Sequence, residues 1–318
     1  MDAEARGAAR PRIAAVGACH LDRKARAAAP FAVGASNPVV LGVCSGGVAR
    51  NVAENLCRLG ADVRLVTRLG NDPEGDALVA GLRGLPPDLP AIDLTGVSRA
   101  AGAPTAFHLI ALQPDGEMLV AVADMRIYDE ITPDLLRALP AALWDVDAIF
   151  ADCNLPAETL GFLAALRGES RKLAVNGVSP AKVVRLRRFL AACDLLFVNR
   201  GEAVALLDQD PAMLAPAAAA AALLDAGAGE VVMTLGGAGL CVATRKETMM
   251  LENLDNRVVD ITGAGDALAA AYLEARLRGV APAAAGRRAL AAAHLTVASE
   301  ASVSPLLSPA ALDRLVTA

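Results

Sequence analysis

Short apolar runs alternate with longer amphipathic segments along almost the whole chain. The runs that predict buried strands are Ile13–Gly17, Val63–Leu69, Ala148–Ala151, Leu173–Val175, Leu195–Val198 and Val231–Leu235. Turn residues and a segment with helical spacing follow these runs; in Ala49–Leu59, for example, Val52, Leu56 and Leu59 share one face. This order predicts an α/β fold, a doubly wound parallel sheet covered by helices on both faces.

Two segments interrupt this alternation. Thr105–Leu112 and Glu117–Val122 are extended runs joined by the sequence QPDG, which predicts a hairpin turn. A second inserted piece spans Phe31–Cys44. We expect both pieces to form a small β-sheet lid over the carboxyl edge of the large sheet, where open α/β folds bind ligands. A plain extension of the sheet edge is the alternative.

The chain is expected to form a single domain over residues 1–318, with lid segments inserted at about 20–44 and 99–125. An alanine-rich stretch, Pro211–Leu224, predicts a helix that is capped by Asp210 and has a proline in its first position. Neither an internal repeat nor an interdomain linker is evident in the sequence.

Composition narrows the classes of function. The 318 residues carry a formal net charge of −5, so the chain lacks the basic character of a nucleic-acid binder. Six cysteines without a C-x-x-C pair indicate neither a zinc site nor a disulfide framework. The first residues lack the apolar core of a signal peptide, and no apolar stretch reaches the ~18–20 residues of a membrane span. We expect a cytoplasmic protein with small-molecule partners and no nucleic-acid or membrane partner.

The most informative motif is VVDITGAGDA at residues 258–267. It predicts an apolar strand followed by a glycine-flanked turn that opens a helix. Unpaired N–H groups at a helix start favour phosphate oxygens, and Gly263 and Gly265 let the backbone approach them. Asp266, in the first turn, can take a proton from a hydroxyl that attacks the phosphorus. An ordinary helix start is the alternative interpretation.

Two further polar turns follow predicted strands in the second half of the chain. The turn TLGGAG can line a nucleotide through Thr234, Gly236 and Gly239, and a plain hairpin is its alternative. Asn199 and Glu202 can orient Mg²⁺-bound waters around a triphosphate. The alternative for these two residues is an ordinary helix cap.

Polar residues near the N-terminus predict a site for a polyhydroxylated ligand. Gly46 and Gly47 can bring main chain against such a ligand, and Asn51 lies one helical turn further on. Asp22 follows the first strand and can accept hydrogen bonds from sugar hydroxyls, although an isolated Asp in a loop is normally a turn residue.

Together these motifs resemble the PfkB, or ribokinase-like, family of carbohydrate kinases, and the match covers nearly the whole chain. SGGVARN at 45–51 resembles the N-terminal signature of the family. DITGAGD at 260–266, preceded by NRGE at 199–202, resembles its C-terminal signature. The resemblance implies transfer of the γ-phosphate of ATP to an alcohol, with Mg²⁺ as cofactor and a homodimer formed through the lid.

The resemblance also implies roles for individual residues. The anion hole is formed by Gly263, Ala264 and Gly265, and Asp266 is the base. Mg²⁺ is supported by Glu202, and ATP is contacted by Asn199, Thr234, Gly236 and Gly239. The sugar is held by Asp22, Gly46, Gly47 and Asn51. In many relatives the positions of Asp260 and Thr262 help to bind a monovalent cation such as K⁺.

Within the family, the chain is most similar to the pseudouridine kinases. Five segments carry this likeness: 45–59, 116–127, 151–154, 178–182 and 199–203. The likeness implies phosphorylation of the 5′-hydroxyl of pseudouridine, with Asn154 facing the base.

Three positions depart from the family pattern. His20 replaces the Asn of an N-x-D motif, Asn176-Gly177 replaces Asp-Pro, and His108 replaces a small or aromatic residue on the lid strand.

Three alternatives differ from this interpretation. One is a PfkB kinase with a ribose, adenosine or fructose-type substrate. Another is a non-catalytic ligand-binding regulator on the same fold, and the joint presence of Asp266, Asn199 and Glu202 argues against it. The third is a dinucleotide-dependent oxidoreductase, which needs G-x-G-x-x-G after the first strand, where VGACHL offers only Gly17.

Overall fold

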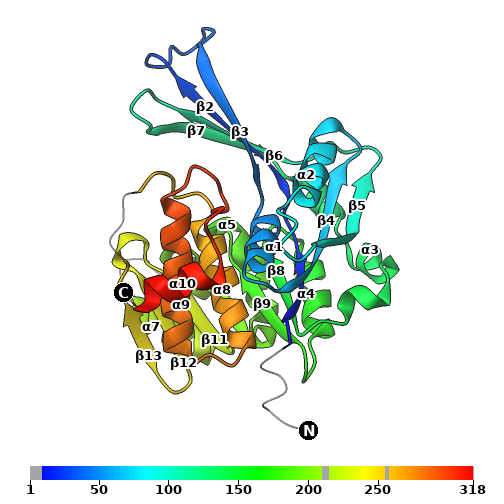
Figure 1. The fold of residues 1–318 in the computed structure, drawn as a ribbon, viewed down its shortest axis with the longest axis vertical. Coiled ribbons are helices and arrows are strands. Elements are labelled where there is room, and N and C mark those ends of the chain that lie inside the picture. The colour runs from blue at the N-terminus through cyan, green and yellow to red at the C-terminus, as the bar shows by residue number, and fades with distance from the viewer. Residues whose placement is uncertain (1–8, 210–214, 255–257, 318) are drawn as a thin grey trace.

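The computed structural model describes residues 9–209, 215–254 and 258–317. A nine-stranded sheet forms the centre of the body, in the order β13-β12-β11-β10-β9-β8-β1-β4-β5 (Figure 1). Its strands are β1 (Arg12–Val16), β4 (Asp62–Gly70), β5 (Asp93–Ala100), β8 (Ala148–Asp152), β9 (Lys172–Asn176), β10 (Leu195–Asn199), β11 (Glu230–Thr234), β12 (Leu240–Thr244) and β13 (Thr248–Leu251). Strands from β11 to β5 pair in parallel, and β12 and β13 join antiparallel at one edge.

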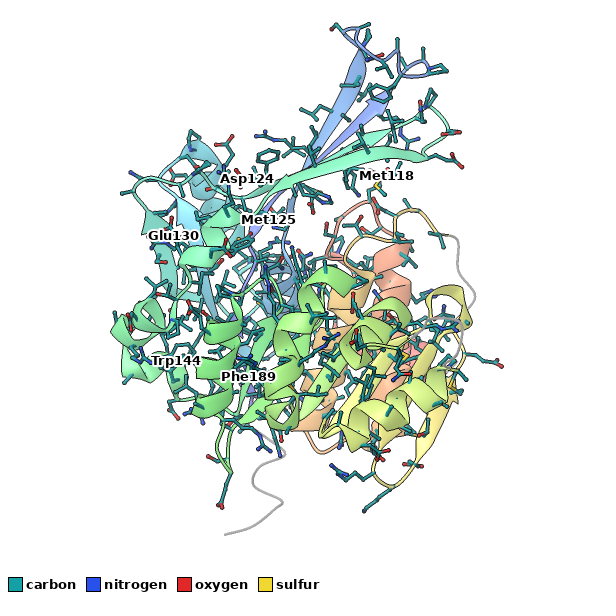
Figure 2. All side chains as sticks on the ribbon, turned by 180° about the vertical axis from the view of Figure 1, so that it is seen from behind. Met118, Asp124, Met125, Glu130, Trp144 and Phe189 are labelled. Atoms are coloured by element: carbon teal, nitrogen blue, oxygen red, sulfur yellow. The ribbon has the colours of Figure 1, made fainter. Side chains whose placement is uncertain are left out.

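Helices cover both faces of this sheet through two apolar cores. One face carries α1 (Val48–Arg58), α2 (Pro73–Arg83), α8 (Ala264–Leu277) and α9 (Pro282–Val297), with α10 (Pro309–Thr317) packed on α9. The other carries α3 (Pro133–Ala138), α4 (Ala157–Leu166), α5 (Pro180–Val183), α6 (Arg200–Leu207) and α7 (Pro216–Asp225). Figure 2 shows this second face, with Trp144 and Phe189 on it.

The predicted doubly wound α/β fold is confirmed. Within the described ranges, no helix is long and apolar enough to cross a membrane.

A separate four-stranded sheet projects from the body as a lid (Figure 1). Its order is β3-β2-β6-β7, from β2 (His20–Ala27), β3 (Val39–Gly46), β6 (Phe107–Leu112) and β7 (Met118–Asp124). The predicted hairpin joins β6 to β7, and Gln113 N donates to Glu117 O at 2.8 Å across its turn. In Figure 2, Met118 lies far out on the lid and Asp124 lies where β7 meets the body.

Some local predictions were wrong or incomplete. Residues 258–261 are not a strand: the N–H groups of Val259 and Asp260 bond to Val297 O at the end of α9, at 2.7 and 3.2 Å. Apolar composition suggested burial there, yet Ile261 is 75% exposed. Strands β5 and β13 were not predicted. The alanine-rich helix begins at Pro216, and Asp210 and Pro211 lie outside the described residues.

Asp72 joins the start of α2 to the base of the lid. Its carboxylate accepts the N–H of Gly75 at 2.8 Å, which caps the helix. It also accepts the N–H and the hydroxyl of Thr105, both at 2.6 Å. Because Thr105 leads directly into β6, this one side chain fixes the lid hairpin to the body.

We predict that Asp72→Ala lowers the free energy of unfolding by about 2 kcal/mol, because the cap is lost and buried Thr105 loses its acceptor. Asp134→Ala is the matched control, since exposed Asp134 pairs with Arg137 on the surface and should contribute less than about 0.5 kcal/mol. Denaturant titration measures both variants. Equal losses in the two would contradict the role given to Asp72.

Candidate active site

The residues predicted for catalysis lie at the start of α8. Gly263 is its N-cap with φ of 81°, in the left-handed region, and a Cβ there would lie 1.9 Å from the carbonyl oxygen of Ser302. Glycine is therefore required at this position. Ala264 and Gly265 follow in the first turn, where the helix dipole adds positive potential; the N–H of Ala264 makes one long bond, to Ile261 O at 3.3 Å. This turn can bind phosphate oxygens.

Asp266 lies in the same turn, half-buried, and contacts the first helix of the chain. The side-chain amide of Asn51, on α1, donates to its Oδ2 at 2.8 Å. Burial raises the pKa of Asp266 to about 7, and the nearby carboxylates of Asp152 and Asp22 act in the same direction, whereas the Asn51 bond opposes the shift. A carboxylate that ionises near neutral pH is suited to act as a general base.

A buried carboxylate whose role the sequence analysis missed ties three segments together. Asp152 ends β8 and is fully buried. Its Oδ2 accepts the N–H groups of Ala18 at 2.8 Å and Ala49 at 3.1 Å, and its Oδ1 accepts that of Asn154 at 2.9 Å. A Cβ on Gly17 would lie 2.2 Å from Oδ2. The sequence signal for this residue was an acidic side chain directly after a fully apolar run.

Asp22 lies buried on lid strand β2 between two imidazoles. His20 Nε2 and His108 Nδ1 each lie 3.4 Å from its Oδ1, and His20 Nδ1 lies 3.0 Å from the hydroxyl of Tyr128. Burial raises the pKa of Asp22, but the hydrogen bonds from His108 and His20 outweigh it and hold the pKa well below its usual range. Asp22 therefore presents a charged acceptor, and both histidines that depart from the family pattern hold it.

The paired glycines are required by close packing between the substrate-side segments. A Cβ on Gly46 would lie 2.1 Å from Oδ2 of Asp22. Gly47 has φ of 98°, and its Cβ would lie 2.5 Å from the carbonyl oxygen of Ala18. These glycines let β2, β3 and the start of α1 meet, which brings Asp22 and Asn51 to the same edge of the large sheet.

Asn154 is buried and its side chain is oriented by Lys182. The Lys182 ammonium donates to Asn154 Oδ1 at 2.5 Å, and burial lowers the pKa of Lys182. Arg185 donates to the carbonyl oxygens of Asn154 and Leu155 at 2.9 and 3.2 Å, which fixes the backbone of this loop. The side chain of Asn154 also hydrogen-bonds to Asp152, so both ends of the amide have a protein partner.

Asn199 and Glu202 form the capping box of α6. Asn199 Oδ1 accepts the N–H of Glu202 at 2.9 Å, and the Glu202 carboxylate accepts from Asn199 N at 3.0 Å and Nδ2 at 2.7 Å. Glu202 is nevertheless at a site as well as in a cap. It lines a hollow of about 180 Å³ together with Asn199, Thr234, Gly265 and Asp266. Burial raises the pKa of Glu202.

Val178 lies at the rim of this hollow with φ of 67°, a left-handed conformation that is an outlier for a β-branched residue. The N–H of Val178 bonds to Asn176 Oδ1 at 2.9 Å. A Cβ on Gly177 would lie 2.7 Å from Oε2 of Glu202. The Asn-Gly departure from the family pattern therefore makes room for Glu202.

A second hollow, of about 460 Å³, continues the first. Asn199 and Thr234 line both, and Gly236 lines the second beside Met250. Gly239 lines neither: its φ is 98° and its Cβ would lie 2.0 Å from Leu251 O, so the β-turn itself requires glycine there. The two hollows share Asn199 and Thr234, so together they give a trough that leads away from Asp266.

Asp260 and Thr262 meet a residue that the sequence analysis did not consider. The ammonium of Lys24, on lid strand β2, donates to Asp260 Oδ2 and, at 3.0 Å, to Thr262 Oγ1. An ammonium group thus occupies the oxygen atoms expected to help bind a monovalent cation. As arranged, these side chains do not fit an added cation.

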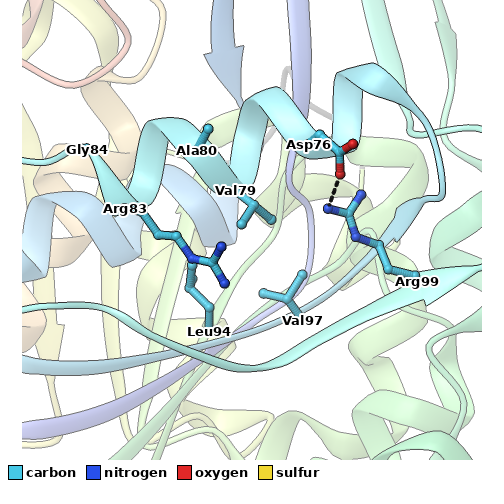
Figure 3. A pocket seen from close by; sticks show the side chains of 8 residues that line it. All are labelled: Asp76, Val79, Ala80, Arg83, Gly84, Leu94, Val97 and Arg99. Atoms are coloured by element: carbon cyan, nitrogen blue, oxygen red, sulfur yellow. Dashed lines mark hydrogen bonds and ion pairs between the residues drawn. The ribbon is translucent and has the colours of Figure 1, made fainter.

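A further hollow, of about 700 Å³, opens between α2 and edge strand β5 (Figure 3). Asp76 and Arg99 form an ion pair of 2.7 Å across its rim, and Val79 and Val97 form its floor. None of the predicted site residues lines it, so its size does not make it the candidate site.

The sequence pattern of the pfkB family carbohydrate kinases matches residues 10–309. The chain belongs to this family, whose members are phosphotransferases that act on an alcohol and use ATP, typically with Mg²⁺.

Curated relatives include two proteins of Escherichia coli. One, named "Uncharacterized sugar kinase YeiI", is 31% identical over 176 residues, which are 55% of this chain and 47% of that protein. The other, a pseudouridine kinase, is 29% identical over 287 residues, 88% of each chain. Among solved structures, a carbohydrate kinase from Agrobacterium tumefaciens is 32% identical with a TM-score of 0.81, covering 96% of this chain and 97% of that one. A ribokinase from Arabidopsis thaliana, solved with ribose and ATP, has a TM-score of 0.83 at 20% identity, covering 98% and 100%, and supports the fold.

We predict that kcat/KM for phosphotransfer rises about tenfold per pH unit below about pH 7 and levels above it, because a base with a pKa of about 7 acts only when ionised. Asn51→Ala removes the hydrogen bond that lowers this pKa, so its acid limb should move to higher pH. Initial rates between about pH 5 and 9 give the acid limb of the parent and that of Asn51→Ala. A parent profile that is flat across pH 7 would contradict the assignment.

Proposed function

We propose that the chain transfers the γ-phosphate of ATP to the 5′-hydroxyl of pseudouridine, giving pseudouridine 5′-phosphate. The observation that carries the proposal is the position of Asp266 between two polar groups. Asn51 bonds to it on one side, and the hollow with Asn199 and Glu202 opens on the other. A hydroxyl held beside Asn51 gives its proton to Asp266 while its oxygen attacks the γ-phosphorus against the 263–265 turn; the bond from this phosphorus to the β,γ-bridging oxygen breaks, and ADP leaves.

Two groups of residues serve ATP and Mg²⁺ in this proposal. Asn199, Thr234, Gly236 and Gly239 contact the nucleotide along or beside the trough. Glu202 holds Mg²⁺ through water: each carboxylate oxygen already accepts from Asn199 and keeps a lone pair for a water molecule. Among the described residues no group of three His, Cys, Asp or Glu is arranged to cage a metal, which suits a water-mediated site. When bound, Mg²⁺ neutralises charge on the β- and γ-phosphates.

Charged and amide groups of the lid and of the 152–154 loop support a nucleoside as the acceptor substrate. Asp22 accepts from ribose hydroxyls, with Gly46, Gly47 and Asn51 beside it. Asn154 Oδ1 has two lone pairs, of which Lys182 uses one, so the other can accept the extra ring N–H that distinguishes pseudouridine from uridine. The relative named as a pseudouridine kinase, alignable over 88% of both chains, supports the same choice.

The test is kcat/KM for pseudouridine, uridine, adenosine, ribose and fructose with ATP and Mg²⁺. Pseudouridine should exceed uridine by about tenfold to a hundredfold, since uridine lacks the ring N–H that donates to the second lone pair of Asn154 Oδ1. Phosphorus NMR should place the phosphate on the 5′-oxygen, and a chelator should abolish turnover. Turnover of ribose or adenosine at equal or higher kcat/KM would refute the substrate while leaving the kinase activity intact.

Asn154→Leu tests the discriminating contact. It should narrow the preference for pseudouridine over uridine by lowering kcat/KM for pseudouridine more than for uridine. Arg126→Leu, at an exposed residue that pairs with Asp124, is the control and should leave the preference unchanged. An absence of phosphate transfer to every acceptor, with ligand binding retained, would instead support a non-catalytic binding protein.

We also propose that two chains form a homodimer through the lid. The register of the lid strands places Leu41, Val43, Val120 and Val122 on the face opposite Asp22. These four side chains are about half exposed, at 54%, 54%, 51% and 48%. Edge strands β3 and β7 carry them, with Ala25 and Ala111 between Leu41 and Val120, and with Arg23 and Leu109 between Val43 and Val122. Exposed apolar side chains gathered on one face of a sheet are typical of an interaction site.

Light scattering of the purified chain should give twice the mass of one chain. Val43→Glu with Val122→Glu should give a monomer, because two carboxylates would be buried without partners. Leu306→Glu, at a residue 71% exposed on the body, is the control and should remain dimeric. A monomeric parent at micromolar concentration would contradict the lid dimer.

A further inference from the structure

Lys24 connects the lid to the turn that precedes the anion hole. It lies two residues after Asp22 on β2, and alternation puts both side chains on the same face of the lid. Its ammonium donates to Asp260 Oδ2 and Thr262 Oγ1, in a contact where the Lys24 and Asp260 side chains are only 20% and 25% exposed. This bond therefore joins segments 236 residues apart in sequence.

The partners of Lys24 belong to a segment with few other restraints. Residues 258–261 form no strand, and their backbone is held by two bonds to Val297 O. Asp260 Oδ1 accepts the N–H of Thr262 at 2.8 Å, which closes a small turn directly before Gly263. The position of Gly263, and with it the first turn of α8, depends on how this small turn is held.

Electrostatics favours the ion pair at neutral pH. Burial raises the pKa of Asp260, but the hydrogen bonds from Lys24 and Thr262 outweigh it and lower the pKa below its usual value. Asp260 is therefore ionised near neutral pH, and the ammonium of Lys24, on the lid, neutralises its charge. A free monovalent cation would have to displace this ammonium.

We propose that Lys24 is a positioning residue that orders the phosphate-binding turn from the lid, and that its ammonium replaces a free monovalent cation at Asp260 and Thr262. Asp22, which receives the substrate, and Lys24 move together because they share one strand. When the lid brings Asp22 to the substrate, it also brings Lys24 to Asp260 and Thr262 and so orders the 260–265 segment. The proposal rests on phosphotransfer by this family and not on the choice of pseudouridine.

The test compares the parent, Lys24→Met, Lys24→Arg and the control Arg26→Met, whose exposed side chain lies two residues further along the same strand face. Phosphotransfer is measured with the best acceptor of the substrate series. Tetramethylammonium is the only cation besides Mg²⁺, before and after addition of K⁺. The parent and Arg26→Met should have the same kcat with and without K⁺.

Lys24→Met should lose about tenfold to a hundredfold in kcat without K⁺ and recover part of it when K⁺ is added, because a charge-assisted hydrogen bond is removed and its site is opened. Its KM for ATP should change less than its kcat, since the turn acts mainly in the transition state. Lys24→Arg should keep most of the activity.

A second measurement is independent of turnover. K⁺ should raise the thermal unfolding temperature of Lys24→Met and leave that of the parent unchanged, since only the variant offers a site for K⁺. Activation of the parent by K⁺ would overturn the proposal, as would a Lys24→Met variant with the parent's kcat in K⁺-free buffer. Because both results use the parent as reference, they stay separate from any failure of the pseudouridine assignment.

Discussion

The carboxylate of Asp152 is the interaction on which the arrangement of the site depends. It is fully buried and accepts three backbone N–H bonds, from Ala18, Ala49 and Asn154. Those three residues begin the segments that carry Asp22, Asn51 and the 154 loop. Burial raises the pKa of Asp152, and the three N–H bonds oppose that shift. Loss of this side chain would remove the acceptor of all three N–H groups at once.

The same carboxylate contributes to the chemistry of its neighbour. Burial and two nearby acids, Asp152 and Asp22, disfavour the charged form of Asp266. Asn51 offers a compensating hydrogen bond. The result is a carboxyl group that gives up its proton near neutrality, whereas Asp22, between two histidines, stays charged. The environments of these two acids thus move their pKa values in opposite directions, which is what the proposed roles of Asp266 as base and Asp22 as a ligand for hydroxyls require.

Much of this arrangement could be predicted because the signals are local. The glycine turn followed by a helical pattern places Gly263 and Asp266 at a helix start, and N-x-x-E at 199–202 forms the capping box seen in the structure. The alternation of apolar runs and helices likewise predicts the parallel sheet. The Glu202 carboxylate that caps the helix also lines the hollow beside Asp266, so the cap does not exclude the predicted role at a site.

What could not be predicted depends on contacts between distant segments. Apolar residues at 258–261 suggested a strand, but the N–H groups of Val259 and Asp260 bond instead to Val297 O at the end of α9. Edge strand β5 has a mixed burial pattern without a continuous apolar run. Lys24 meets Asp260 only because the lid folds over the body, so nothing in the sequence around either residue indicates the pair.

The central claim is that Asp266 removes the proton of the attacking hydroxyl. The most direct measurement is kcat of Asp266→Asn with saturating ATP and acceptor, beside its unfolding curve. A positioned base contributes roughly 10²–10⁴-fold, so kcat should fall by that factor while the variant remains folded and still binds ATP. A folded Asp266→Asn enzyme with kcat within a few-fold of the parent would contradict the claim.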